Sequence, residues 1–141
     1  MKKALILYKS RTGTTRKLGE NIRQFLVEND VVSDIKSIEE AGSINLEGVD
    51  FVFLGCWTSG LMVVFQGPEK SWVEFARKLP DMNGTTPVLF TTYKLLTGTM
   101  FRNMQKHLKY GKENAPLPVI KSRNGLLPEA GRALLSQILV S

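Results

Sequence analysis

The chain of 141 residues, 43% of them hydrophobic and 23% charged, has the size and composition of one compact domain, which we expect over residues 1–141. Its single Cys56 and single His107 exclude a disulfide framework and a multi-cysteine metal or iron–sulfur centre, and no metal site is predicted. The net charge of +6 is spread along the chain and no apolar segment approaches the roughly 20 residues that cross a bilayer, so we expect a cytoplasmic protein without nucleic acid or membrane span.

The N-terminal elements are a buried strand followed by an amphipathic helix. Ala4–Tyr8 is almost wholly apolar, as a parallel strand covered on both faces should be. The run stops at Lys9, before it reaches the length of a signal peptide, so none is expected. Apolar residues then recur at helical spacing, which predicts a helix from about Thr14 to Glu28.

Weaker signals precede the next buried strand. Val31–Ile38 alternates only weakly between apolar and polar residues, which predicts a shorter and more exposed strand, and Glu39–Leu46 indicates a turn or a poor helix. Phe51–Leu54 is apolar throughout and predicts a buried strand that ends at Gly55. A long irregular segment is expected over Cys56–Gly67.

A helix and a further strand follow. Pro68 suits the first turn of the helix, and Pro80 stops it. The apolar residues of this helix recur at i, i+3, i+4 and i+7, namely Trp72, Phe75, Ala76 and Leu79. Pro87–Thr91 predicts the strand, and a loop around Tyr93 follows it. The next helix carries Phe101, Met104 and Leu108.

Val119–Ile120 marks a last short strand, and Pro128 opens a final helix whose inward residues are Leu134, Leu135, Ile138 and Leu139. Strands that alternate with helices in this way predict an α/β fold, an open parallel sheet with helices on both faces, because right-handed crossovers force that layering. Such a sheet binds ligands beyond the carboxyl ends of its strands, where the strand order reverses. The loops expected at that edge are 9–15, 55–67 and 91–99.

The loop between the first strand and the first helix combines hydroxyl side chains with one glycine. Ser10, Thr12, Thr14 and Thr15 can donate through their hydroxyl groups, and Gly13 lets successive backbone N–H groups converge. The following helix adds unpaired N–H groups and the positive end of its dipole, which favour a phosphate dianion without requiring a lysine. The simpler alternative is that these residues only cap a helix.

The pattern S-x-T-G-x-T, directly after the first strand, resembles the phosphate loop of the flavodoxin family, and the resemblance covers essentially the whole chain. It implies a flavodoxin-like open five-stranded parallel sheet of order 2-1-3-4-5. It also implies FMN as the cofactor. The loop residues expected at the FMN phosphate are Ser10, Arg11, Thr12, Gly13, Thr14 and Thr15, of which Thr14 contributes mainly its backbone N–H.

Other families that handle phosphate are not supported by the residues. The nucleotide-triphosphate pattern GxxxxGK[ST] and the dinucleotide pattern GxGxxG are both absent. A response-regulator receiver shares this fold, but it would need acidic residues after the first strand and an aspartate at the end of the third. This chain has Lys9-Ser10 and Gly55-Cys56 at those places.

In the flavodoxin family the isoalloxazine ring lies between the loops that follow the third and fourth strands, and the resemblance implies the same here, with backbone near residues 58–60 at flavin N5. The expected contacts are Cys56, Trp57, Thr58, Ser59 and Gly60 in the first loop and Thr91, Thr92, Tyr93 and Gly98 in the second. Trp57 and Tyr93 would supply flat apolar area. The simpler alternatives are that Trp57 anchors a loop and that Cys56 is an inert buried thiol.

Two departures from the family pattern bear on the redox chemistry. Leu61–Phe65 is apolar where the family carries many acidic residues, and it could serve as a lid, a partner contact, a contact to a second copy or plain core packing. No Asp or Glu occurs at residues 51–68 or 82–112, whereas basic candidates to lie near the flavin are Arg11, Lys94 and Arg102. Because carboxylates disfavour the anionic reduced flavin, we predict a less reducing couple than in acidic flavodoxins and partners with an acidic docking face.

The leading hypothesis is therefore an FMN electron carrier between redox partner proteins, a monomer or weak dimer, with no catalytic residues of its own. One alternative is a flavodoxin-like FMN oxidoreductase that acts on a small substrate such as a quinone or tetrapyrrole, although the chain lacks the long inserted segment of protoporphyrinogen oxidases of this fold. Another is a regulatory or scaffold protein without flavin. The sequence favours a carrier over a stand-alone enzyme and leaves the question open.

Overall fold

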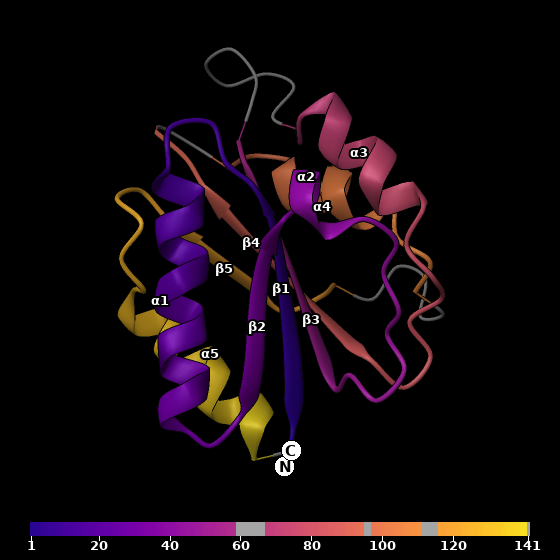
Figure 1. Ribbon diagram of the computed structural model, residues 1–141. Coiled ribbons are helices and arrows are strands. Elements are labelled where there is room, and N and C mark those ends of the chain that lie inside the picture. Colours follow the sequence, from indigo (N-terminus) through magenta and orange to yellow (C-terminus); the bar gives the residue numbers. More distant parts are fainter. Residues whose placement is uncertain (59–66, 95–96, 111–115, 141) are drawn as a thin grey trace.

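The computed structural model describes residues 1–58, 67–94, 97–110 and 116–140. Within them a five-stranded parallel sheet has the order β2-β1-β3-β4-β5, with helices on both faces (Figure 1). Its strands are β1 Lys3–Lys9, β2 Val32–Ser37, β3 Phe51–Trp57, β4 Thr86–Thr92 and β5 Val119–Ser122. The fold class and the strand order expected from the sequence are confirmed.

β1 lies inside the sheet, between β2 and β3. Its Ile6 is in register with Ile35 of β2 and with Phe53 of β3. Successive side chains of a strand point to opposite faces, so Ile6 and Leu7 enter different hydrophobic cores. Both are fully buried, which explains why this strand is apolar at nearly every position.

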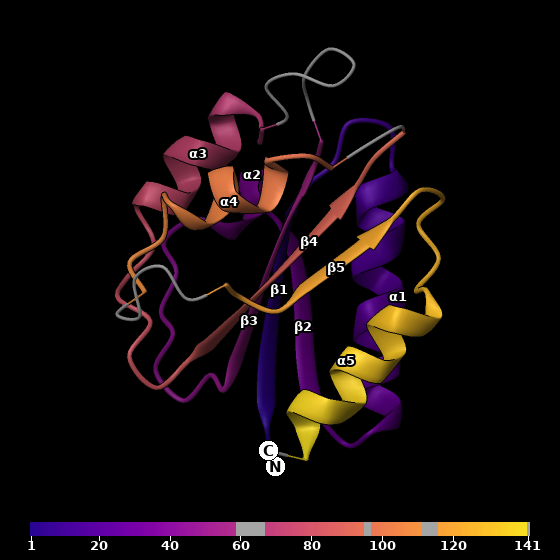
Figure 2. The same cartoon turned by 180° about the vertical axis from the view of Figure 1, so that it is seen from behind.

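Helices α1 (Thr14–Glu28) and α5 (Glu129–Leu139) cover one face of the sheet (Figure 2). α1 buries a stripe of Leu18, Ile22 and Leu26, which repeats every four residues and so stays on one side of the helix. Each fully buried side chain of this size contributes about 1.5–3 kcal/mol. The helix predicted from Thr14 to Glu28 is confirmed at both ends.

Helices α3 (Lys70–Arg77) and α4 (Met100–Gln105) cover the other face with the short α2 (Ile38–Ala41). Their buried side chains are Trp72, Ala76, Met100 and Met104, which pack on the same core as Leu54 and Leu89 of the sheet. The four residues of α2 correspond to the turn or poor helix expected there. Within the described ranges, no helix combines the length and the apolar character that a membrane span requires.

β3 continues past Gly55, where the sequence suggested that it would end. Gly55 pairs with Phe90 of β4, and Cys56 and Trp57 extend the ladder. A Cβ atom built on Gly55 would lie 2.1 Å from a ring atom of Phe90, so the glycine makes room for that ring instead of ending the strand. The expected irregular segment therefore begins only after Trp57. Residues 59–66, with the expected flavin contacts Ser59 and Gly60 and the apolar run 61–65, lie outside the described residues.

Candidate functional site

The loops identified from the sequence meet at one edge of the sheet. The chain leaves β1 toward β2 on one side and later returns to β3 on the other, so the strand order reverses at the carboxyl ends of β1 and β3. The loop after β1 lies at the same end of the sheet as the ends of β3 and β4 (Figure 1). The N–H of Thr58 donates to the carbonyl of Thr92 over 2.9 Å, which ties these last two strand ends together.

Ser10 organises the loop after β1. Its Oγ accepts hydrogen bonds from the backbone N–H of Gly13 (3.0 Å) and of Arg16 (3.4 Å). A hydroxyl has two acceptor sites and one donor, so the Ser10 hydrogen stays available for a ligand oxygen. Gly13 has a φ of 91°, in the left-handed region where a side chain would be strained. The hydroxyl and the glycine together bend the loop over the start of α1.

Several backbone N–H groups of this loop have no acceptor within the protein and can therefore bind a ligand. In the part of the chain that the structure describes, the N–H groups of Thr12, Thr14 and Thr15 have no acceptor. The first backbone bond of α1 runs from the N–H of Lys17 to the carbonyl of Gly13, over 3.0 Å. Thr12 and Gly13 are exposed, so solvent and ligands reach this helix end. Unpaired amides and the positive end of a helix dipole favour an anion.

The Thr15 side chain turns inward, away from the exposed part of the loop. Only 1% of Thr15 is exposed, and its Oγ1 lies 2.5 Å from Oγ1 of Thr92, which is itself 6% exposed. This hydroxyl pair joins the first turn of α1 to the end of β4. The Thr15 hydroxyl is thus engaged inside the protein, and its backbone N–H is the donor that faces no partner. A phosphate contact of Thr15 stays a prediction.

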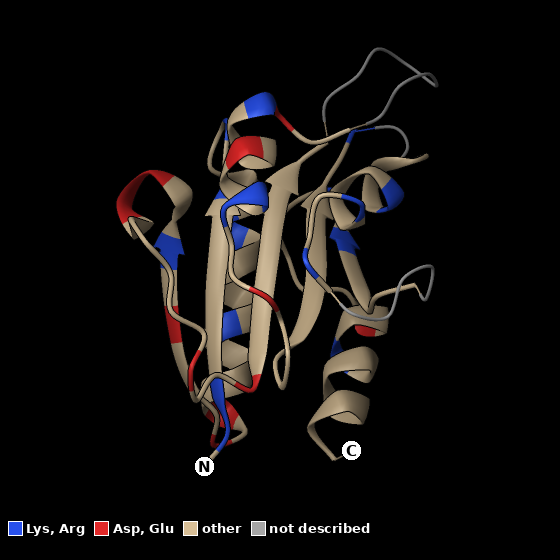
Figure 3. Cartoon of the chain, turned by 90° about the vertical axis from the view of Figure 1, so that its right-hand side faces the viewer, with Lys and Arg blue, Asp and Glu red and all other residues tan. Residues whose placement is uncertain are grey.

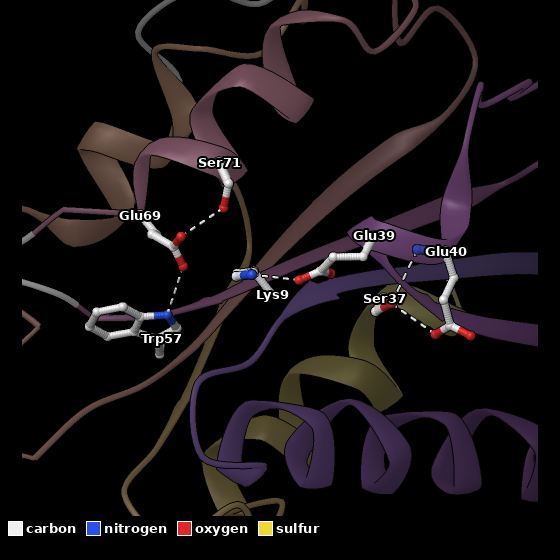
Figure 4. Close-up of polar contacts among 7 residues, drawn as sticks. All are labelled: Lys9, Ser37, Glu39, Glu40, Trp57, Glu69 and Ser71. Carbon is white, nitrogen blue, oxygen red and sulfur yellow. Dashed lines mark hydrogen bonds and ion pairs between the residues drawn. The ribbon is translucent and has the colours of Figure 1, made fainter.

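Trp57 makes a hydrogen bond through its indole N–H (Figure 4) and a cation–π contact through its ring. Its Nε1–H donates to Oε2 of Glu69 over 3.3 Å, and the Ser71 hydroxyl donates to Oε1 of the same carboxylate over 2.9 Å. The guanidinium carbon of Arg11 lies 5.1 Å from the centroid of the indole ring, within the range of a cation–π contact. Trp57 therefore links the end of β3 to the loop after β1 and to the start of α3.

Lys9, at the end of β1, lies between two carboxylates. Its Nζ donates to Oε1 of Glu39 over 2.5 Å, and Figure 4 shows its ammonium group between Glu39 and Glu69. The hydrogen bond to Glu39 raises the pKa of Lys9. Burial is the largest single influence and acts to raise the pKa of Glu39, but the hydrogen bonds from Lys9, the backbone and Ser37, together with the charge of Lys9, outweigh it, so this pKa lies below its ordinary value. Both groups consequently stay charged near neutral pH.

The ends of β3 and β4 are joined by side-chain hydrogen bonds next to Trp57. The Thr91 hydroxyl lies 2.5 Å from the Cys56 carbonyl, to which it donates, and 2.8 Å from the Thr58 hydroxyl. Cys56 is fully buried, and burial raises the pKa of its thiol to about 12. The thiol is thus protonated and shielded from solvent, which fits the simpler alternative of an inert side chain.

Two cations lie near the Tyr93 ring, one from β5 and one from the residue directly after it. Its N–H donates to the carbonyl of Ser122 over 3.2 Å, which brings the end of β5 beside it. Lys121 Nζ lies 5.8 Å and Arg123 Cζ 5.2 Å from the Tyr93 ring centroid. Gly98, in the same expected loop, has a φ of 49° that favours glycine. The two aromatic residues proposed from the sequence thus each carry positive charge on the ring.

The residues of this site that the sequence analysis missed include Glu69, Lys121 and Arg123. A signal for Glu69 exists, because it directly follows Pro68 at the start of a predicted helix, where acidic residues are favoured. No local signal places Lys121 and Arg123 beside Tyr93, because that contact depends on the pairing of β4 with β5.

The known proteins that this chain resembles are flavodoxins and flavodoxin-like proteins. A flavodoxin domain family model matches residues 5–62, which include the loop after β1, β3 and Trp57. The flavodoxin-like domain-containing protein BilS of Clostridioides difficile (strain CD3) is 38% identical over 55 residues, which are 39% of this chain. The matched stretch spans 31%, about a third, of the length of that relative.

Solved flavodoxins share the whole architecture at low sequence identity. The two-electron reduced Megasphaera elsdenii flavodoxin superposes with a TM-score of 0.65 and 22% identity, covering 93% of this chain and 94% of that one. The Fusobacterium nucleatum flavodoxin bound to flavin mononucleotide gives a TM-score of 0.65 at 15% identity, with 99% and 98% covered. A flavodoxin domain model thus matches the first part of the chain, and the described residues have the flavodoxin-like fold.

Proposed function

We propose that this chain binds FMN and carries electrons between redox partner proteins, as one flavodoxin-like domain over residues 1–141. Bound FMN supplies the redox chemistry, because its ring can accept and release electrons one or two at a time. The protein holds the phosphate, encloses the ring and sets the electrostatic surroundings. No catalytic side chain is required for this function.

The observation that carries the proposal is the donor set of the loop after β1. It offers the Ser10 hydroxyl hydrogen and the unpaired amides of Thr12, Thr14 and Thr15, all at the positive end of α1. Neutral donors in this arrangement suit the several oxygens of a phosphate monoester, which FMN carries at the end of its chain. The FMN bound to the Fusobacterium nucleatum flavodoxin, which has the same fold, supports this choice of ligand.

The ring site lies between Trp57 and Tyr93, which stand at the ends of β3 and β4 and supply flat apolar area. Lys121 and Arg123, which lie over the Tyr93 ring, bring positive charge to this place. Cations near the flavin stabilise its anionic reduced form. The flavin couple is therefore less reducing than in acidic flavodoxins, and a redox titration that found an equally low potential would contradict this.

The partner proteins carry an acidic docking face in this proposal. Lys94, Lys121 and Arg123, which we call the basic surface, are exposed around the ends of β4 and β5. Figure 3 shows acidic residues on β2 and α2, with one basic residue near the end of β2, whereas β5 at the opposite edge of the sheet carries the basic Lys121 and no acidic residue. Opposite charges steer association of proteins that meet only briefly. A monomer or weak dimer and a cytoplasmic location stay predictions.

Titration of the flavin-free chain with FMN tests the function directly. We expect one FMN per chain, quenched flavin fluorescence and a dissociation constant of about 1 μM or below, since the phosphate and the ring both find partners. A chain that stays colourless and takes up no FMN at micromolar concentrations would contradict the proposal.

A second assay separates a carrier from an oxidoreductase. The FMN-loaded chain is mixed with NADH or NADPH, with and without a quinone. A carrier bleaches only when a reductase is added, whereas steady nicotinamide oxidation without one would favour the enzyme.

A further inference from the structure

Arg11 belongs to the loop that is proposed to bind phosphate, yet its guanidinium lies on an aromatic ring. Its Cζ is 5.1 Å from the Trp57 ring centroid. Within the described residues, the structure gives its side chain no hydrogen bond or ion pair. Arg11 is exposed, and a cation–π contact at an exposed site is weak. The guanidinium is therefore only lightly held.

Trp57, in contrast, is fixed from another element. Its indole N–H is bound by Glu69, and the Ser71 hydroxyl binds the second oxygen of the same carboxylate (Figure 4). Glu69 and Ser71 lie at the start of α3, whose Trp72 and Ala76 are buried in the core. When the two partners separate, the mobile one is thus the arginine, and the indole stays in place.

We propose that Arg11 makes ring binding at Trp57 depend on the phosphate, and so selects FMN over riboflavin. This rests on the proposed function. Without ligand, the guanidinium covers a face of the indole. When FMN binds, its phosphate offers a charge-assisted hydrogen bond, which is stronger than the cation–π contact, and the guanidinium leaves the ring. Riboflavin has the same ring system without the phosphate, so it must displace Arg11 without offering it a new partner.

Arg11→Gln separates the two roles of this side chain. The flavin-free wild type and the variant are each titrated with FMN and with riboflavin. We expect the variant to bind riboflavin about threefold more tightly, because the competing cation is gone, and FMN about tenfold more weakly, because a charge-assisted bond is lost. A general loss of positive charge would instead leave riboflavin binding unchanged.

Arg132→Gln is the matched control. Arg132 also lies over an aromatic ring, with its Cζ 5.8 Å from the centroid of Phe25, but it belongs to α5. The control removes the same charge and the same type of contact at another place. Both flavin affinities should stay within about twofold of wild type, as expected for an exposed charge away from the ligand.

Tryptophan emission reports the movement itself without any flavin. Trp72 is fully buried, so acrylamide quenching reports mainly on Trp57. Inorganic phosphate added to the flavin-free wild type should increase the quenching as the guanidinium leaves the indole, and it should have no effect in Arg11→Gln. Trp57→Leu removes the ring on which Arg11 lies, so adding Arg11→Gln to it should give no gain in riboflavin affinity.

Two results would overturn the proposal while leaving the FMN function intact. One is a wild type that binds FMN while Arg11→Gln binds riboflavin no better than wild type. The other is Trp57 quenching that does not respond to phosphate. A wild type that binds neither flavin overturns the proposed function itself, and this inference with it.

Discussion

Gly55 and Gly19 both lie next to the buried ring of Phe90, but the space available for a side chain differs between the two positions. A Cβ atom on Gly19 of α1 would lie 3.5 Å from the Phe90 ring, an ordinary contact. A Cβ atom on Gly55 would lie 2.1 Å from it. Phe90 is fully buried, and protein cores are close-packed, so moving its ring aside is costly. At the residue scale, Gly55 is thus the position of this core that tolerates a side chain least.

Gly55→Ala should therefore destabilise the protein. We expect a loss of about 2 kcal/mol in the free energy of unfolding, typical of an overpacked core, measured by urea denaturation. If the Phe90 ring is the cause, Gly55→Ala in a Phe90→Leu background should cost at least about 1 kcal/mol less than in the wild type. An alanine variant as stable as the wild type would show that the ring has another place to go.

The candidate site divides into residues that the sequence could predict and residues that it could not. Ser10–Thr15 are contiguous, and their chemistry can be recognised from the hydroxyls, the glycine and the place between strand and helix. The inward turn of Thr15 depends on Thr92, 77 residues away. Likewise, the cations on Tyr93 come from β5 and from the residue directly after it. Contacts of this kind are set by the packing of α1 on the sheet and by strand pairing, and they lie beyond any local pattern.

At the scale of elements, the spacing of apolar residues was enough to predict the bounds of α1 but not the end of β3. The helix carries apolar residues at a regular spacing, and its bounds follow from that spacing. β3 contains a glycine, which in a single sequence is typical of a strand end, although here it serves close packing against β4. The fold class and strand order were predictable, since they rest on the alternation of strands and helices and on the family resemblance.

α3 and the segment after α4 are joined by a hydrogen bond that depends on pH. Arg77 Nε–H donates to Nδ1 of His107 over 3.2 Å, so the imidazole must be neutral at that atom. Burial first, and then the charges of Arg77 and Lys106, lower the pKa of His107. The unfolded chain therefore binds the proton at a higher pH than the folded chain does.

Stability should accordingly fall as the pH drops through the unfolded-state value, about 6.5, toward the lower pKa of the folded state. His107→Gln cannot titrate, so this part of the pH dependence should disappear. The difference should stay below about 1 kcal/mol, because the pair is exposed to solvent. Urea unfolding of both proteins between pH 5 and pH 8 measures it. Identical pH profiles would show that His107 is not linked to folding.

At the scale of the whole molecule, charge is distributed unevenly over the sheet edges. The ion pairs of the described residues include Lys9 with Glu39 and Arg16 with Glu20, on the side of β1, β2 and α1. The basic surface around the ends of β4 and β5 lies at the other side, and residues 82–112 contain no acidic residue. A carboxylate-rich partner would meet this surface next to the proposed ring site.

Lys121→Glu/Arg123→Glu should slow electron transfer to or from an acidic protein. Reduced plant-type ferredoxin serves as an acidic probe, and stopped-flow absorbance follows reduction of the FMN-loaded chain. We expect a rate about tenfold lower than wild type at low salt and a difference that fades above about 0.5 M salt, because screening removes the steering. Lys36→Glu/Lys78→Glu makes the same charge change on other elements and should slow transfer much less. Equal slowing by both pairs would count against the basic surface.

Phosphorus NMR of the FMN-loaded chain tests most directly whether the loop after β1 binds the FMN phosphate as a dianion. The phosphate of free FMN takes up a proton with a pKa of about 6, so its resonance moves between pH 5 and pH 8. Donors such as the Ser10 hydroxyl and the loop amides stabilise the dianion, so we expect a separate bound resonance that stays fixed over this range. A bound phosphate that titrates like the free cofactor would contradict it.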